Sequence, residues 1–178
     1  MTKAVFLDRD GTLIEDRGDL AHPSQVVFFG DTVGALRRLA EHYLLFIVTN
    51  QSGVAKGTIT PEDVQRVNAY IEQYLAAQGI PLAATYVCPH QRSCGCRCIK
   101  PKPYFLQQAE RDFGADLSRS FTVGDHPHDV AFALRAGAVG VYVLSGHGRK
   151  HRAGVPEQAI VVEGIREAAD WILASGTP

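Results

Sequence analysis

The chain has 178 residues, of which 46% are hydrophobic and 21% charged, and its formal net charge at pH 7 is -1. This composition excludes a disordered or fibrous chain, and the length suits a single domain that spans residues 1–178. The near-zero charge, without a run of basic residues, argues against a nucleic-acid or membrane-surface partner, so a small dissolved ligand is expected.

Short apolar runs alternate along the chain with segments of helical periodicity. The predicted strands are residues 4–7, 44–48, 84–87, 120–123, 139–143 and 159–162. Helices are predicted within residues 31–42, after a cap at Thr60 and before a stop at Gly114, whereas the last four residues, SGTP, are expected to fray. This alternation predicts an α/β fold with a mostly parallel sheet and helices on both of its faces.

Two aspartates, Asp8 and Asp10, directly follow the first predicted strand in the run VFLDRDGTLI. Carboxylates this close repel each other, so at the end of a buried strand they need a cation, a shared proton or water. Thr49 and Asp125 follow two other predicted strands, and parallel strands bring their carboxyl ends to one edge of a sheet. Each residue alone also fits a simple strand end or helix cap. Together, Asp8, Asp10 and Asp125 predict an oxygen-only site for Mg²⁺.

These residue types also suit phosphoryl transfer. A carboxylate beside a metal ion can attack phosphorus, and Asp8 is the candidate nucleophile. Asp10 is then placed to protonate the leaving alcohol and later to deprotonate a water molecule. Lys100, in the stiff segment Lys-Pro-Lys-Pro, is the candidate cation for the transferred group, although a solvated surface lysine is the alternative. Thr49 and Asn50 would add neutral donors.

All four cysteines lie close together, between residues 88 and 98. No run of about 18 apolar residues could span a membrane, and a charged residue interrupts every window near the N-terminus that could serve a signal peptide, so a cytoplasmic protein is expected. In a reducing compartment, clustered cysteines indicate a metal site before disulfides. The candidate ligands, one more than tetrahedral zinc requires, are Cys88, His90, Cys94, Cys96 and Cys98. Unliganded thiols are the alternative.

Four motifs in order resemble those of the haloacid-dehalogenase-like (HAD) phosphohydrolases over nearly the whole chain. They are DRDGTL at residues 8–13, VTNQSG at 48–53, Lys100 before a helix, and VGDHPHD at 123–129. The resemblance implies a three-layer, Rossmann-like fold with Asp8 as nucleophile and Asp10 as general acid and base. It also implies that Thr49 and Lys100 stabilise the phosphoryl group. The implied Mg²⁺ ligands are Asp8, the carbonyl of Asp10 and Asp125, with Asp129 orienting Lys100.

DRDGT, TNQSG and the cysteine loop together are most similar to the D-glycero-D-manno-heptose-1,7-bisphosphate 7-phosphatases and the related histidinol-phosphate phosphatases. This subgroup is capless, which implies that short loops contact the sugar. The implied substrate-binding residues are Asp16, Arg17, Gly18, Asp19, Asn50, Gln51, Ser52 and the position of Ile99. The implied ligands of a structural zinc are Cys88, His90, Cys96 and Cys98, which leaves Cys94 spare.

Two positions depart from the pattern of this subgroup. Ile99 stands where the subgroup commonly has an arginine that helps to recognise the substrate, and Arg92, Arg97 or Lys102 could replace it. After Asp125 the family often has lysine or serine, whereas this chain has His126 and, two residues later, His128.

The expected protein is a monomeric, Mg²⁺-dependent phosphatase that removes the 7-phosphate of the heptose bisphosphate through an aspartyl-phosphate. Histidinol phosphate, or another small phosphosugar, is the alternative substrate. A phosphoacceptor switch domain is the alternative of another class, and Asp10 argues against it because an acid at this position favours turnover. The charge argues against a zinc-dependent nucleic-acid-binding module, and the proposed role of Asp10 argues against dehalogenase chemistry.

Overall fold

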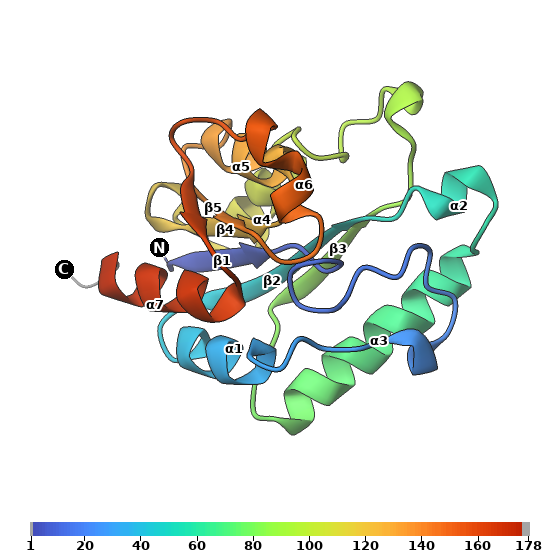
Figure 1. Cartoon of the computed structure of the whole chain (residues 1–178), viewed down its shortest axis with the longest axis horizontal. Helices are drawn as coiled ribbons and strands as arrows, with labels where there is room; N and C mark the ends of the chain where they lie inside the picture. The colour runs from blue at the N-terminus through green and yellow to red at the C-terminus, as the bar shows by residue number, and fades with distance from the viewer. Residues whose placement is uncertain (1, 176–178) are drawn as a thin grey trace.

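The computed structural model describes residues 2–175 and is built around a parallel six-stranded sheet (Figure 1). The strands are β1 (Ala4–Leu7), β2 (Leu44–Asn50), β3 (Ala84–Cys88), β4 (Phe121–Gly124), β5 (Val139–Val143) and β6 (Ile160–Val162). Their order across the sheet is β3-β2-β1-β4-β5-β6. Every predicted strand is present, with its ends shifted by no more than two residues. Of the four residues predicted to fray, Ser175 is the last residue of the final helix, and residues 176–178 lie outside the described part of the chain.

Strand β1 lies at the centre of the sheet and is buried on both faces. Val5 and Leu7 belong to one hydrophobic cluster, while Ala4 and Phe6 belong to another on the opposite face. Phe6 stacks on Phe46 of β2, with ring centroids 4.9 Å apart. Burying one such aromatic side chain contributes about 1.5–3 kcal/mol. The strand that precedes Asp8 is therefore firmly held.

Helices cover both faces of the sheet, which confirms the predicted three-layer α/β architecture (Figure 1). One face carries α1 (Thr32–Ala40), α3 (Pro61–Ala77) and α7 (Ile165–Ser175). The other carries α4 (Tyr104–Phe113) and α5 (Pro127–Leu134). Two short helices, α2 (Gly53–Lys56) and α6 (Gly148–His151), lie in loops.

Helix ends follow the local sequence at most positions. The Thr60 hydroxyl accepts from the Asp63 N–H at the start of α3, as the capping pattern predicts. Gly114 ends α4 with a left-handed φ of 66°. Helix α5 was not predicted, because its cap is a histidine: the ring of His126 accepts from the His128 N–H.

The strand order places a crevice beside the end of β1. After β3 the chain crosses to the other side of β1 and forms β4, so the sheet is wound in opposite directions from β1 and β4. Ligands of open α/β sheets bind at this switch point, outside the carboxyl ends of the strands. In the described chain, no separate lid domain interrupts the connections between strands. None of the helices within residues 2–175 has both the length and the apolar composition needed to cross a lipid bilayer.

Candidate active site

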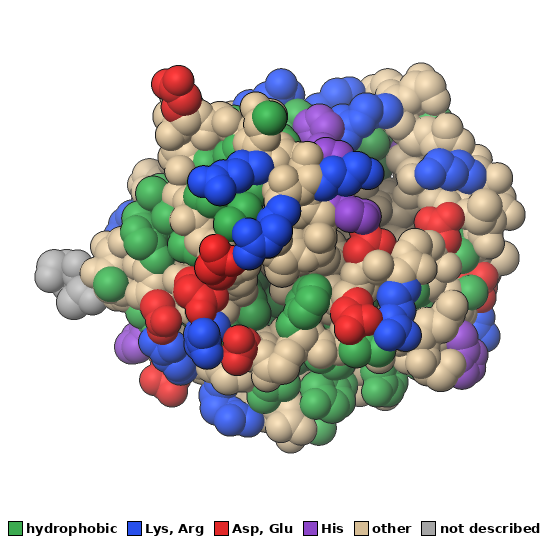
Figure 2. Space-filling model, in the orientation of Figure 1, with side chains coloured by type: hydrophobic (Ala, Val, Ile, Leu, Met, Phe, Trp, Pro, Cys, Tyr) green, Lys and Arg blue, Asp and Glu red, His purple; other side chains and the backbone are tan. Residues whose placement is uncertain are grey.

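A pocket of about 200 Å³ lies at the carboxyl ends of β1, β2 and β4. On the molecular surface it is a hollow with acidic groups inside it and histidines along its rim (Figure 2). Its lining residues are Asp8, Asp10, Asp16, Thr49, Asn50, Arg92, Lys100, Asp125, His126, His128, Asp129 and His147. The pocket therefore gathers Asp8, Asp10, Thr49, Lys100, Asp125 and Asp129, the residues that the four motifs indicated.

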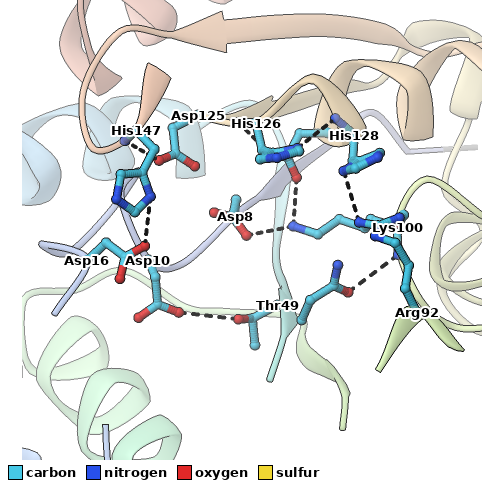
Figure 3. Close-up of a pocket in the computed structure, with 12 residues that line it drawn as sticks. Asp8, Asp10, Asp16, Thr49, Arg92, Lys100, Asp125, His126, His128 and His147 are labelled. Atoms are coloured by element: carbon cyan, nitrogen blue, oxygen red, sulfur yellow. Dashed lines mark hydrogen bonds and ion pairs between the residues drawn. The ribbon is translucent and has the colours of Figure 1, made fainter. Parts of the chain in front are cut away.

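Lys100 reaches into this pocket as a buried cation (Figure 3). Its Nζ lies 2.6 Å from Asp8 Oδ1 and 2.6 Å from Asp129 Oδ1, and it also donates to the Val48 carbonyl at 3.0 Å. Burial alone would lower the pKa of Lys100, but the carboxylates of Asp129 and Asp8 outweigh it and raise the pKa. The lysine is therefore held as an ammonium ion.

The acidic groups that surround Lys100 outnumber it. Burial raises the pKa of Asp8 well above its ordinary value, and the carboxylates of Asp129 and Asp125 add to the effect while Lys100 opposes it. Burial likewise raises the pKa of Asp125 to about 6. Carboxylate oxygens of Asp8, Asp125 and Asp129 lie within 4.8 Å of one another. This excess of hard, anionic oxygen fits a divalent cation such as Mg²⁺.

Asp129 is less available to a metal than the other two carboxylates. Its Oδ1 accepts from Lys100, and its Oδ2 accepts from the His126 N–H at 3.1 Å. Asp8 and Asp125 are thus the side chains best placed to bind Mg²⁺. The predicted ligand from Asp10 is its main-chain carbonyl, and its carboxylate lies outside the group of three.

Gly11 allows the Asp125 carboxylate to approach the loop after β1. Its φ is +84°, and a Cβ at this position would overlap Asp125 Oδ2. The glycine that follows the two aspartates is therefore required by both the backbone turn and the close contact.

Asp10 is held by donors that sequence reasoning missed. Arg9 donates from Nε to Asp10 Oδ2 at 2.9 Å and from Nη2 to Asp10 Oδ1 at 3.1 Å. Gln51 Nε2 donates to Asp10 Oδ2 at 2.9 Å and to Thr49 Oγ1 at 2.8 Å. The Thr49 hydroxyl lies 3.5 Å from the same Asp10 oxygen. Arg9 was missed because an arginine between two aspartates on a loop is expected to face water.

The rim of the pocket carries a second cation. Arg92 Nη2 donates to His128 Nδ1 at 2.9 Å, and Arg92 Nη1 donates to the Lys100 carbonyl at 3.3 Å. Burial, followed by the charge of Arg92, lowers the pKa of His128 to about 4, so the neutral ring accepts this bond. No carboxylate within residues 2–175 forms a salt bridge with Arg92. The guanidinium is therefore free to bind an anion.

On the opposite side of the pocket, His147 contacts two acids (Figure 3). Its main-chain N–H donates to Asp125 Oδ2 at 2.8 Å, and its ring Nδ1 lies 3.2 Å from Asp16 Oδ2. His147 lies in the loop after β5, far from every motif, so the sequence carried no signal for it.

Of the predicted substrate-binding residues, Asp16 and Asn50 line the pocket. The structure does not bring the others to it, namely Arg17, Gly18, Asp19, Gln51, Ser52 and Ile99. Arg17 pairs with Glu15, and Asp19 accepts from the Thr58 hydroxyl, so their functional groups are engaged elsewhere. Ile99 is buried in the hydrophobic cluster between the sheet and α4.

The three candidates to replace the missing arginine have different positions. Arg92 lines the pocket. The guanidinium of Arg97 stacks over the ring of Tyr104, 4.5 Å from its centroid. Lys102 Nζ donates to the Gly95 and Cys96 carbonyls of the cysteine loop.

The cysteine loop brings four potential ligands together. They are Cys88, His90, Cys96 and Cys98, whose ligand atoms all lie within 4.8 Å of one another. Cys96 Sγ is 3.6 Å from Cys88 Sγ and 3.7 Å from Cys98 Sγ, close to the spacing across a tetrahedral zinc site with Zn–S bonds of about 2.3 Å. Cys98 Sγ and Cys88 Sγ are closer to each other, at 2.9 Å. Cys94 is exposed and lies outside this group. The donor set fits zinc and matches the four residues that the resemblance implied.

Comparisons with known proteins agree on one family. A family model described as HAD-hydrolase-like matches residues 97–168. The D-glycero-beta-D-manno-heptose-1,7-bisphosphate 7-phosphatase of Yersinia pestis is 37% identical, and the match covers 97% of this chain and 90% of that protein. The corresponding alpha-named enzyme of Campylobacter jejuni is also 37% identical, with 84% and 86% covered.

A solved structure resembles the whole fold. The D,D-heptose 1,7-bisphosphate phosphatase of B. bronchiseptica, complexed with magnesium and phosphate, has a TM-score of 0.90 at 30% identity, and the match covers 98% of this chain and 99% of that one. The chain therefore belongs to the D-glycero-D-manno-heptose-1,7-bisphosphate 7-phosphatase family of HAD-like hydrolases.

Proposed function

We propose that this protein is a Mg²⁺-dependent phosphomonoesterase that removes the 7-phosphate of D-glycero-D-manno-heptose 1,7-bisphosphate. The names of its relatives support the substrate. The observation that carries the chemistry is the buried contact of Lys100 with both Asp8 and Asp129, beside the Asp10 carboxylate. This arrangement supplies a nucleophile, a fixed cation and an acid–base group in one pocket.

In the proposed reaction, a carboxylate oxygen of Asp8 attacks the phosphorus atom, and the bond from phosphorus to the sugar oxygen breaks. Asp10 gives its proton to that leaving oxygen, then takes a proton from the water molecule that cleaves the aspartyl-phosphate. Lys100 and the Thr49 hydroxyl stabilise the transferred group. Mg²⁺, held by Asp8, Asp125 and the Asp10 carbonyl, would supply positive charge for the phosphoryl oxygens.

Arg92 supports a substrate with two phosphates. Lys100 is already balanced by two carboxylates, whereas Arg92 on the rim has no acidic partner in the described chain. A guanidinium suits phosphate because its planar array of donors matches the phosphate oxygens. We assign to Arg92 the recognition of the phosphate that is not cleaved, in the role that Ile99 cannot fill.

A structural zinc ion is proposed for Cys88, His90, Cys96 and Cys98. The loop that carries these residues also carries Arg92 and leads directly into Lys100. Its four ligands form a closed set, which is typical of a structural rather than a catalytic site. The metal would hold a polar segment that has little hydrophobic core of its own.

The test is to measure kcat/KM with Mg²⁺ on both anomers of the heptose bisphosphate, on histidinol phosphate and on simple sugar phosphates. The proposal predicts a strong preference for a heptose bisphosphate and a loss of about 1,000-fold or more in Asp8→Asn. A preference for histidinol phosphate would change the substrate and leave the chemistry intact. Stable accumulation of the phosphorylated protein without turnover would instead indicate a phosphoacceptor switch.

A further inference from the structure

Arg9 is the largest of the fully buried side chains in the described chain, although it lies on the loop after β1. Only 1% of its surface is exposed, and it does not line the pocket. Taking a guanidinium out of water is costly unless its donors are paired. Arg9 forms a bidentate ion pair with Asp10, in which Nε donates to Oδ2 and Nη2 donates to Oδ1.

Asn68 holds the far side of this guanidinium. Arg9 Nη1 donates to Asn68 Oδ1 at 2.8 Å, and Asn68 is itself buried. Asn68 lies on α3, whose neighbouring residues Val64, Val67 and Ile71 are buried in the core. The guanidinium of Arg9 is therefore anchored to a long helix that packs on the sheet.

The donors are distributed unequally over the two oxygens of Asp10. Oδ2 accepts from Arg9 Nε and from Gln51 Nε2, and the Thr49 hydroxyl lies nearby. Oδ1 accepts from Arg9 Nη2 alone among these donors. A carboxylate oxygen has two lone pairs, so Oδ1, which accepts one hydrogen bond, keeps a lone pair that can hold a proton.

Solvation of the Asp10 carboxylate does not require the buried Arg9. Its side chain is 17% exposed, so water could solvate the carboxylate without a buried arginine. Burying a guanidinium instead adds a fixed orientation, which a catalytic acid–base group needs and a solvated carboxylate lacks.

We propose that Arg9, braced by Asn68, is a positioning residue that fixes the plane of the Asp10 carboxyl and makes Oδ1 the oxygen that exchanges the proton. The inference rests on the acid–base role of Asp10 in the proposed function. In the first step, the Oδ1 proton moves to the sugar oxygen as its bond to phosphorus breaks and the bond from Asp8 to phosphorus forms. In the second, Oδ1 takes a proton from the water that attacks the aspartyl-phosphate and releases Asp8.

The test compares two leaving groups in the Mg²⁺-loaded protein. A sugar alkoxide needs a proton as it leaves, whereas nitrophenolate leaves readily without one. The measured quantity is the ratio of kcat/KM on the heptose bisphosphate to kcat/KM on p-nitrophenyl phosphate. Asp10→Asn should lower this ratio the most, because it removes the acid altogether.

We expect Asn68→Ala to lower the ratio about tenfold and Arg9→Lys to lower it further, since general acid catalysis contributes about 100- to 10,000-fold in total. Asn68→Asp, which keeps an acceptor oxygen for Arg9, should restore the ratio. Gln73→Ala, an amide removed from the exposed side of the same helix, should not change it.

A ratio in Asn68→Ala within threefold of the wild-type value would overturn the inference, whatever the absolute activity. Asn68→Ala serves as the main variant because Arg9→Lys alters a fully buried charge and could unfold the protein. If Asp10→Asn also leaves the ratio unchanged, the acid–base role in the proposed function fails as well. The two failures are therefore distinguishable.

Discussion

The ammonium group of Lys100 lies 2.6 Å from Asp8 Oδ1, although the two residues are 92 positions apart in the chain. Both side chains of this pair are largely buried: that of Lys100 is 5% exposed and that of Asp8 is 13% exposed. Asp129 accepts from the same ammonium group. The lysine thus neutralises part of the charge that burial makes costly at Asp8, while the carboxylate of this proposed nucleophile still lines the pocket.

Lys100→Met should impair both stability and catalysis. Removing the cation leaves two buried carboxylates without their partner, so the free energy of unfolding should fall by about 3–5 kcal/mol. Loss of a fixed charge beside the transferred phosphoryl group should lower kcat/KM by about 100- to 1,000-fold. Urea denaturation and steady-state kinetics measure the two effects. Lys102→Met, which loses contacts only to loop carbonyls, should retain activity within a few-fold.

Arg92→Ala should discriminate between substrates with one and two phosphates. Losing charge-assisted bonds to the second phosphate should raise KM for the heptose bisphosphate about tenfold or more. KM for a heptose 7-monophosphate should change little, because that substrate offers no second phosphate. Arg97→Ala is the matched control, since Arg97 stacks on Tyr104 outside the pocket. An equal rise in KM for both substrates would show that Arg92 has another role.

Zinc content should depend on Cys98 and not on Cys94. Cys98→Ser removes one of four clustered ligands and should reduce bound zinc from about one ion per chain to well below that. Cys94→Ser should keep the ion, because Cys94 lies outside the cluster. Elemental analysis after purification in metal-free buffer measures both variants. Wild-type protein without zinc, with all four thiols open to titration, would refute the site.

Asp125 should make the metal-free protein less stable as the pH rises. Burial raises its pKa from 3.8 to about 6 in the folded state, so the folded protein binds this proton more tightly than the unfolded chain. Its stabilising contribution is complete below about pH 4 and is lost as the pH rises through about 6. At pH 7 in EDTA, Asp125→Asn should therefore be more stable than wild type by about 1–3 kcal/mol.

Urea denaturation of both proteins across this pH range isolates the contribution of Asp125, since their other groups are shared. The difference should shrink towards pH 4, and a difference that does not change with pH would contradict the assignment. Added Mg²⁺ should stabilise the wild type and have little effect on Asp125→Asn, because the substitution removes a proposed ligand.

The sheet could be predicted from the sequence because its four inner strands are buried on both faces and form nearly continuous apolar runs. Residues 4–7 and 139–143 match β1 and β5 at both ends. Helix α5 was missed because its cap, His126, is not a residue type that usually begins a helix.

The catalytic candidates were predictable for a related reason. Asp8 and Asp125 follow strands of a parallel sheet and Thr49 lies near the end of another, and topology alone brings such residues to one edge. Residues that reach the pocket from loops carry no such signal. Arg92 and His147 depend on the folded path of their loops, and Arg9 depends on Asn68, which lies 59 positions away.

The two cations of the pocket come from the same connection, between β3 and α4, but reach different parts of the site. Lys100 meets Asp8 beside the central strands, whereas Arg92 stands on the cysteine loop that follows the edge strand β3. An inhibitor that mimics only the transferred phosphate would contact Asp8, Thr49 and Lys100, which belong to the motifs that resemble those of the HAD phosphohydrolases. A compound that spans from Lys100 to Arg92 would add a contact made by the rim of this chain, and its selectivity among related enzymes should come from that second anchor.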